Sequence, residues 1–218
     1  MTRTQSGAAI SALLAALLSG GAFAQTAADV QRNINQQRRI QDGLRDGSLT
    51  TREAARLERG QARVERTESR ALRDGSISPA EQHRITEAQN RQSQAIHNQR
   101  SDAQRGDPNS ASSQRMQQDV ARNIHQQKRI ESGIRSGQLT NREVGRLERG
   151  ESRVNRMQAH AGRDGHVGRF EQQRIDRAQN RESRAIHHER HDGQRRGGYQ
   201  PSRFDNGRGD HGWHRGRG

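Results

Sequence analysis

Histidine residues gather near the end of this 218-residue chain, where their type and spacing favour metal binding. His187 and His191 stand four residues apart in a segment predicted to be helical, so both imidazoles would lie on one face and could share one ion. His188 lies between them. Because imidazole nitrogens suit nickel, zinc and copper, one hypothesis is a divalent-metal site at His187, His188 and His191.

The turns between the predicted helices suggest a second kind of metal chemistry, because they resemble the calcium loops of EF-hands. With Gly47 as the sixth loop position, Asp42 takes the first position and Glu53 the twelfth. The third position is Leu44, where a calcium loop needs an oxygen ligand. Three further turns also lack the full oxygen set, with these residues at the first, third and fifth positions: Arg70, Leu72, Asp74; Ser132, Ile134, Ser136; and His160, Gly162, Asp164. We interpret the turns as degenerate hands whose Gly and Glu cap helices.

Arginine supplies the third candidate chemistry. The segment 195–218 interleaves Gly and Arg with Tyr199, Phe204 and Trp213, a composition that contacts polyanions by charge and stacking. It cannot build a core, and we expect it to be disordered. The best candidates for polyanion binding in this tail are Arg195, Arg196, Arg203, Arg208, Arg215 and Arg217.

Catalytic patterns are missing. The chain has no Cys for a thiol nucleophile, and its Ser residues fall at helix caps and in linkers. Glu58, Glu65 and Glu148 stand three or four residues from Arg, so we expect them to be ion-pair partners on helix surfaces. Aromatic residues make up 2% of the chain, which leaves little material for an apolar pocket. We therefore expect a non-enzymatic protein that needs no cofactor, unless it holds one of the metals above.

An internal duplication organises the residues that must position these groups. Residues 29–104 and 119–194 align at a constant offset of 90 without gaps, and 43 of the 76 paired positions are identical. Hydrophobic residues recur at helical spacing in three stretches of each copy. The stripes are narrow and diluted by Gln, as in coiled coils. The sequence therefore predicts an all-α fold of two tandem three-helix units.

Punctuation between the stretches supports this division. Gly47 and Gly75 stand where a helix ends in a left-handed residue. Thr50 with Glu53, and Ser78 with Glu81, then form capping boxes that begin the next helix. Short connections favour antiparallel neighbours, so each copy should run up, down and up. The apolar stripes could close within one unit, or meet those of the other copy or of another chain.

The pattern GxLTxRExxRLExxQ, which begins at Gly47, resembles uncharacterised exported helical-repeat proteins of proteobacteria with degenerate EF-hand-like turns (GxLTxxE). The resemblance covers both copies. It implies an exported helical protein and brings no activity with it.

The segments outside the copies concern export and charge. Residues 1–24 have a basic start, a short apolar run and a small-x-small ending, so we expect a signal peptide that is cleaved between Ala24 and Gln25. No other segment approaches membrane-spanning length. Segment 105–118 is expected to be a flexible linker. The formal net charge is +14, and loss of one Arg with the signal leaves +13.

Three functions remain open at this point. The leading one is electrostatic binding of an anionic partner in the periplasm or outside the cell, such as lipopolysaccharide, nucleic acid or an acidic glycan. Arg residues on the helix faces and in the tail would bind it. One alternative is binding or buffering of divalent metals by the His cluster (Ni, Zn or Cu) and the degenerate loops (Ca). The other is a structural role, in which the stripes pair with another helical envelope protein. The oligomeric state is not predicted.

Overall fold

The computed structural model describes the backbone of residues 9–194 and the side chains of residues 23–194, and the regular structure in this range is entirely helical. This confirms the predicted all-α fold, with three helices in each copy. The first copy contains the second part of α1 (Ala9–Arg45), together with α2 (Thr51–Ala71) and α3 (Pro79–Ser101). The second contains most of α4 (Ala111–Arg135), followed by α5 (Asn141–Ala161), a short 3-10 turn, η1 (Gly162–Asp164), and α6 (Arg169–His191).

The helices begin and end where their local sequence dictates. Thr50 accepts a hydrogen bond from the Glu53 N–H, and the Glu53 carboxylate accepts one from the Thr50 N–H, which completes the predicted capping box of α2. Ser78 with Glu81 does the same for α3. Gly47 and Gly75 have φ values of +74° and +94°, the left-handed conformation that ends a helix at little cost for Gly.

Within each copy, the third helix packs against the first two, and glutamine joins them. Gln89 on α3 donates to the backbone carbonyl of Asp29 on α1 at 3.0 Å, and Gln179 on α6 donates to that of Asp119 on α4 at the same distance. The Gln residues that dilute the apolar stripes therefore serve as buried cross-links between helices. Each copy is a three-helix unit, as predicted.

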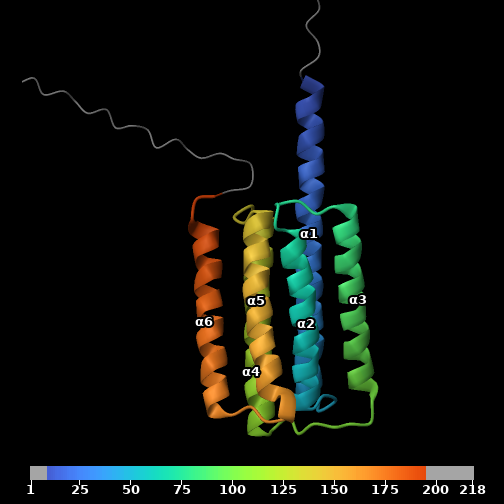
Figure 1. Cartoon of the computed structure of the whole chain (residues 1–218), viewed down its shortest axis with the longest axis vertical. Helices are drawn as coiled ribbons and strands as arrows, with labels where there is room; N and C mark the ends of the chain where they lie inside the picture. The colour runs from blue at the N-terminus through green and yellow to red at the C-terminus, as the bar shows by residue number, and fades with distance from the viewer. Residues whose placement is uncertain (1–8, 195–218) are drawn as a thin grey trace, which may run out of the picture.

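The two units pack on each other through equivalent helices, α1 against α4 and α2 against α5, with α3 and α6 on the outside (Figure 1). Arg52 at the start of α2 donates to the carbonyl of Asp164, just beyond the end of α5, at 2.9 Å. Arg142 at the start of α5 donates to the carbonyl of Asp74, just beyond the end of α2, at 3.0 Å. The paired helices are therefore antiparallel, and a pseudo-twofold axis relates the copies. The sequence left open which apolar stripes pair with one another. In the structure, the stripes of one copy pack against those of the other.

A single hydrophobic core spans both copies and runs along this interface. It includes Ile34, Ile40 and Leu44 from α1 and their counterparts Ile124, Ile130 and Ile134 from α4. Small residues bring α2 and α5 close together: a Cβ added to Gly145 would lie 2.9 Å from the Cβ of Leu72. The close approach fixes the outer surface of α2 beside that of α5.

The start of α1 and the linker between the copies bear on the predicted signal peptide and on the predicted flexible linker. Helix α1 runs continuously through the expected cleavage point at Ala24, and its N-terminal part extends beyond the bundle (Figure 1). Signal cleavage stays a prediction. No helix in the described range is both long and apolar enough to cross a membrane. Helix α4 begins at Ala111, capped by Ser110, so part of the segment expected as the 105–118 linker is helical. The rest of the linker contacts the connection between α1 and α2, where the Gly106 N–H donates to the Gly47 carbonyl at 2.9 Å.

Candidate functional site: an arginine face over a carboxylate core

Arginine occupies every fully exposed position of α2. The exposed residues of this helix recur every three, four or seven positions and therefore follow one side of it. All of them are arginines: Arg52, Arg56, Arg59, Arg63 and Arg70. Arg66, which is half-buried, continues the row. The other side of α2 is buried against α1, α3 and α5.

Helix α5 repeats the arrangement because the duplication conserves it. Its exposed residues are Arg142, Arg146, Arg149, Arg153, Arg156 and His160. Since α2 and α5 are antiparallel neighbours, the two rows form one surface, which we call the arginine face: Arg52, Arg56, Arg59, Arg63, Arg66, Arg70, Arg142, Arg146, Arg149, Arg153 and Arg156. Figure 1 shows α2 and α5 together on the side of the bundle toward the viewer, with α1 and α4 behind them.

The charge of the arginine face is not matched by neighbouring carboxylates. Within the described residues, Arg146 is its only member with a carboxylate oxygen within 4 Å, at 3.7 Å from Glu189. Arg52 and Arg142 donate to backbone carbonyls instead. Desolvation, and then the positive charges of Arg66 and Arg153, lower the pKa of Arg156. The face therefore presents a like-charged surface that an anion can neutralise.

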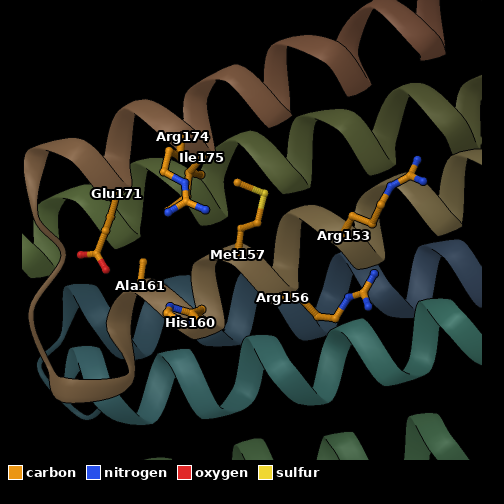
Figure 2. Close-up of a pocket in the computed structure, with 8 residues that line it drawn as sticks. All are labelled: Arg153, Arg156, Met157, His160, Ala161, Glu171, Arg174 and Ile175. Atoms are coloured by element: carbon orange, nitrogen blue, oxygen red, sulfur yellow. The ribbon is translucent and has the colours of Figure 1, made fainter.

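A pocket of about 480 Å³ opens at the edge of the arginine face, between α5 and α6. Figure 2 shows Arg153 and Arg156 toward one end and Glu171 at the other, with Arg174 between them. Met157 and Ile175 supply apolar lining. In the first copy the equivalent residues between α2 and α3 line two hollows, one of about 310 Å³ with Arg70, Glu81 and Arg84, and one of about 420 Å³ with Arg63, Arg66 and Arg70. The second-copy pocket therefore offers arginine charge beside an apolar lining, with one carboxylate at its far end.

Carboxyl groups lie in the core beneath the arginine face, which corrects one expectation. Glu58, Glu65 and Glu148, expected as surface partners of Arg, are at most 1% exposed and form no ion pair. Helix α2 is covered by three neighbouring helices, so its buried surface is wider than the apolar stripe alone indicates. Glu151 is also fully buried, and both of its carboxylate oxygens lack a hydrogen-bond partner.

Burial raises the pKa values of these carboxyls and so favours their neutral forms. Desolvation raises the pKa of Glu58 to about 8, although Gln37 donates a hydrogen bond to it at 3.1 Å. Desolvation and then the nearby Asp29 raise the pKa of Glu68 to about 8. Burial, and then neighbouring carboxyls, also raise the pKa values of Glu65 and Glu151. The neutral forms that burial favours offset less of the arginine charge above them than ionised carboxylates would.

The predicted histidine site is not arranged for chelation. The rings of His187 and His191 stack with centroids 4.3 Å apart and planes 19° from parallel. The Nδ1 atom of His191 lies 2.7 Å from the carbonyl oxygen of His187, so that nitrogen is positioned to donate to the backbone. Because a ring nitrogen binds metal in the plane of its ring, stacked rings direct their lone pairs side by side and not toward one ion. His188 is exposed on the same helix.

The degenerate loops use their oxygens internally. Asp46, Asp74 and Asp164 each accept a hydrogen bond from the backbone N–H two residues later, at 2.8 to 2.9 Å. These contacts order the turns without an ion. In residues 23–194, one group of three potential ligands comes together, and it comprises Glu143, Glu189 and Asp192.

The sequence directed attention to the tail, whose candidates Arg195, Arg196, Arg203, Arg208, Arg215 and Arg217 lie outside the described residues. The arginine face was missed as a specific site, although its signal is visible as an Arg every three or four residues along α2 and α5. No family model, curated protein or solved structure matches the chain.

Proposed function

We propose that this protein is a non-enzymatic, exported binder of polyanions and that the arginine face is its main binding surface. One observation carries the proposal: the exposed positions of two adjacent antiparallel helices are arginine almost without exception, with a single carboxylate within 4 Å. An isolated row of arginines is commonly a solvated helix surface. Two rows held side by side concentrate charge, and a rigid surface of this kind attracts polyanions.

The dimensions of the arginine face suit an extended anionic chain. A helix of 21 residues, the length of α2 and of α5, spans about 30 Å. Arginines three or four residues apart are separated by about 5 Å along the axis. Guanidinium groups bind phosphate and carboxylate in a bidentate fashion. Lipopolysaccharide phosphates, nucleic acid and acidic glycans all offer this chemistry, and the expected signal peptide favours a partner in the periplasm or outside the cell.

Two other functions receive less support. The stacked rings argue against His187 and His191 binding one nickel, zinc or copper ion together. The apolar stripes of the two copies cover one another. In residues 23–194, Phe170 is the one large hydrophobic side chain that is exposed. Pairing with another helical protein therefore lacks an obvious surface on the described helices.

The test compares the arginine face with the opposite side of the bundle at equal charge. Changing Arg59, Arg63, Arg149 and Arg153 to Gln removes four charges from the centre of the face, and changing Arg38, Arg45, Lys128 and Arg135 to Gln removes four exposed charges from α1 and α4. A third variant lacks residues 195–218. Affinity for heparin, lipopolysaccharide and duplex DNA is measured at several salt concentrations.

We expect the face variant to bind at least about tenfold more weakly in low salt, with a shallower dependence on salt concentration, because fewer counterions are released. The α1/α4 variant should retain most of the affinity. Equal losses in the two variants would reduce the effect to net charge and contradict the proposal. Loss of binding only on removal of 195–218 would move the site to the tail.

A further inference from the structure

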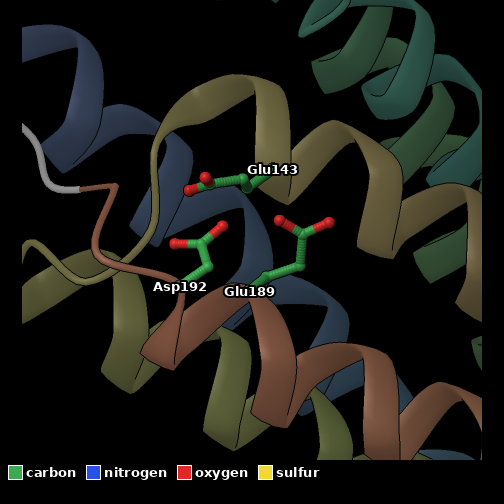
Figure 3. Close-up of side chains that lie close together, drawn as sticks. All are labelled: Glu143, Glu189 and Asp192. Carbon is green, nitrogen blue, oxygen red and sulfur yellow. The ribbon is translucent and has the colours of Figure 1, made fainter.

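The strongest unassigned site in the described residues is a carboxylate triad where the start of α5 meets the end of α6. Glu143 lies in the first turn of α5, Glu189 in the last turn of α6, and Asp192 directly after α6. One carboxylate oxygen from each residue lies within 4.8 Å of the other two. Figure 3 shows the three carboxylates gathered at this junction.

The oxygen spacing matches what a hard cation requires. Calcium binds oxygen ligands at 2.3 to 2.6 Å, so two oxygens on one ion are at most about 5 Å apart. The triad satisfies this limit for all three pairs. Water would complete a coordination shell of six to eight oxygens. The negative end of the α6 dipole favours a cation here, whereas the positive end of the α5 dipole, at Glu143, opposes it.

A second observation at this place is an unpartnered carboxylate oxygen. Glu143 is fully buried, and its Oε1 atom has no hydrogen-bond partner, whereas its Oε2 atom accepts from the Thr140 N–H at 2.7 Å. The equivalent Oε1 atom of Glu53 in the first copy also lacks a partner, so what distinguishes the second copy is that two further carboxylates approach Glu143. A buried carboxylate oxygen without a partner carries a desolvation cost that a bound cation would remove. Burial raises the pKa of Glu189, Arg146 opposes this rise, and the nearby Glu143 and Asp192 add to it.

Arg146 only partly compensates for the triad. Its Nη1 atom lies 3.7 Å from the Glu189 carboxylate, and its side chain is 55% exposed, so the contact is long and screened by water. His188 favours the ionised form of Glu189 but is itself exposed. The negative charge of the triad therefore remains available to a divalent ion.

The first copy supplies a natural control. Its equivalent residues are Glu53, Gln99 and Asp102, so an amide replaces the central carboxylate. The Gln99 Nε2 atom lies 3.5 Å from Asp102 Oδ2, where a weak hydrogen bond replaces carboxylate repulsion. The fold thus accepts glutamine here, and only the second copy gathers three acids.

We propose that Glu143, Glu189 and Asp192 form a binding site for a hard divalent cation, with calcium as the preferred ion, and that this site exists in the second copy alone. Glu143 occupies the twelfth position of the degenerate loop in this copy, where a calcium loop also places Glu. The remaining protein ligands come from the end of α6 and not from the loop. The site touches the arginine face at Arg146, but its proposed ligands belong neither to that face nor to the histidine pair.

The experiment is isothermal titration calorimetry of the full chain with calcium chloride, after removal of divalent ions. Calcium separates this site from histidine, which prefers nickel, zinc and copper. We expect one calcium per chain, with a dissociation constant of about 10⁻⁴ to 10⁻³ M, as in extracellular calcium modules. Glu189→Gln, which recreates the first-copy arrangement, should weaken binding at least about tenfold. Gln99→Glu should add a second site.

Thermal unfolding with and without calcium checks that each variant folds and reports binding independently, because a ligand of the native state raises the midpoint. His187→Ala combined with His191→Ala should leave calcium binding unchanged. The proposal is overturned if the wild type shows neither heat nor a midpoint shift with millimolar calcium. It is also overturned if Glu189→Gln binds as the wild type does.

Discussion

Replacing Glu68 by glutamine isolates the charge of one buried carboxyl in the core. Glu68 is 2% exposed and accepts hydrogen bonds from Asn33 at 2.8 Å and Gln89 at 2.9 Å. The second copy already has glutamine at this position: Gln158 accepts from Asn123 at 2.8 Å, as Glu68 does from Asn33. The change to Gln therefore keeps the size and the contact to Asn33 while it removes the titrating group.

The expected effect depends on pH, and its sign follows from proton binding. Burial, followed by Asp29, raises the pKa of Glu68 from 4.5 to about 8 in the folded protein. Between these values the folded state holds a proton that the unfolded state has lost. The stability contributed by the neutral carboxyl is complete below pH 4.5 and is lost as the pH rises to about 8. For one such group, each pH unit in this window lowers the free energy of unfolding by about 1.4 kcal/mol.

From pH 5 to pH 7, ionisation linked to Glu68 should therefore lower the free energy of unfolding of the wild type by up to about 2.7 kcal/mol. Glu68→Gln should lack this contribution. The two proteins should be similarly stable at pH 5, and the variant should be more stable at pH 7 and above. Burial of Glu58 and Glu151 contributes a slope to both proteins, whereas loss of Glu68 also removes a charge that raises the pKa values of Glu65 and Glu148, which adds to the difference in the same direction.

Urea denaturation followed by circular dichroism at pH 5, 6, 7 and 8 measures the difference. Glu87→Gln is the control, because it also replaces a carboxyl by an amide, but at a side chain that is 49% exposed. Parallel pH profiles for the wild type and Glu68→Gln would refute the reasoning. A variant that is less stable at every pH would show that Glu68 is needed as a carboxylate in the core.

Two further changes test how the helices are joined. Thr140→Ala removes the side chain that accepts from the Glu143 N–H and should lower the free energy of unfolding by about 1 kcal/mol in urea denaturation; an unchanged midpoint would mean that the cap contributes nothing. Gly47→Ala forces a φ of +74° on alanine and places a Cβ 3.0 Å from the Gly106 carbonyl oxygen, so it should cost about 1 kcal/mol or more. Gly165→Ala is its control, since its φ is +91° but no atom lies within 4 Å of the added Cβ, and its smaller loss should appear in the same assay. Equal losses would attribute the whole effect to backbone strain.

Local features of the fold were predictable because their causes lie within a few residues. Thr50 and Glu53 satisfy each other across one turn, and Gly47 relieves a backbone constraint at its own position. The pairing of the copies was not predictable. Because the stripes of the two copies are nearly identical, Ile34 could equally pack within its own unit, against the second copy or against another chain. Only the three-dimensional packing selects the second of these.

The candidate sites follow the same division. Glu58 stands between arginines at helical spacing, and this pattern is shared by surface ion pairs and by a buried acid beneath an arginine row. Burial distinguishes the two cases, and it depends on how many helices surround α2. Glu143 and Glu189 are 46 positions apart in the sequence, so their approach depends on the packing of α6 against α5.

The antiparallel pairing of α2 with α5 has an electrostatic consequence that links fold and function. It places two rows of arginine side by side, and like charges at such spacing repel one another. Ionised Glu58, Glu65 and Glu151 would relieve this repulsion from below, but burial raises their pKa values and so disfavours ionisation. Close packing at Gly145 and one core shared by both copies must therefore hold the rows together. A polyanion bound across the arginine face would relieve the repulsion from above, and any ligand of the native state stabilises it. The arginine face, whose repulsion destabilises the free protein, is thus the surface that the proposed partner would stabilise most.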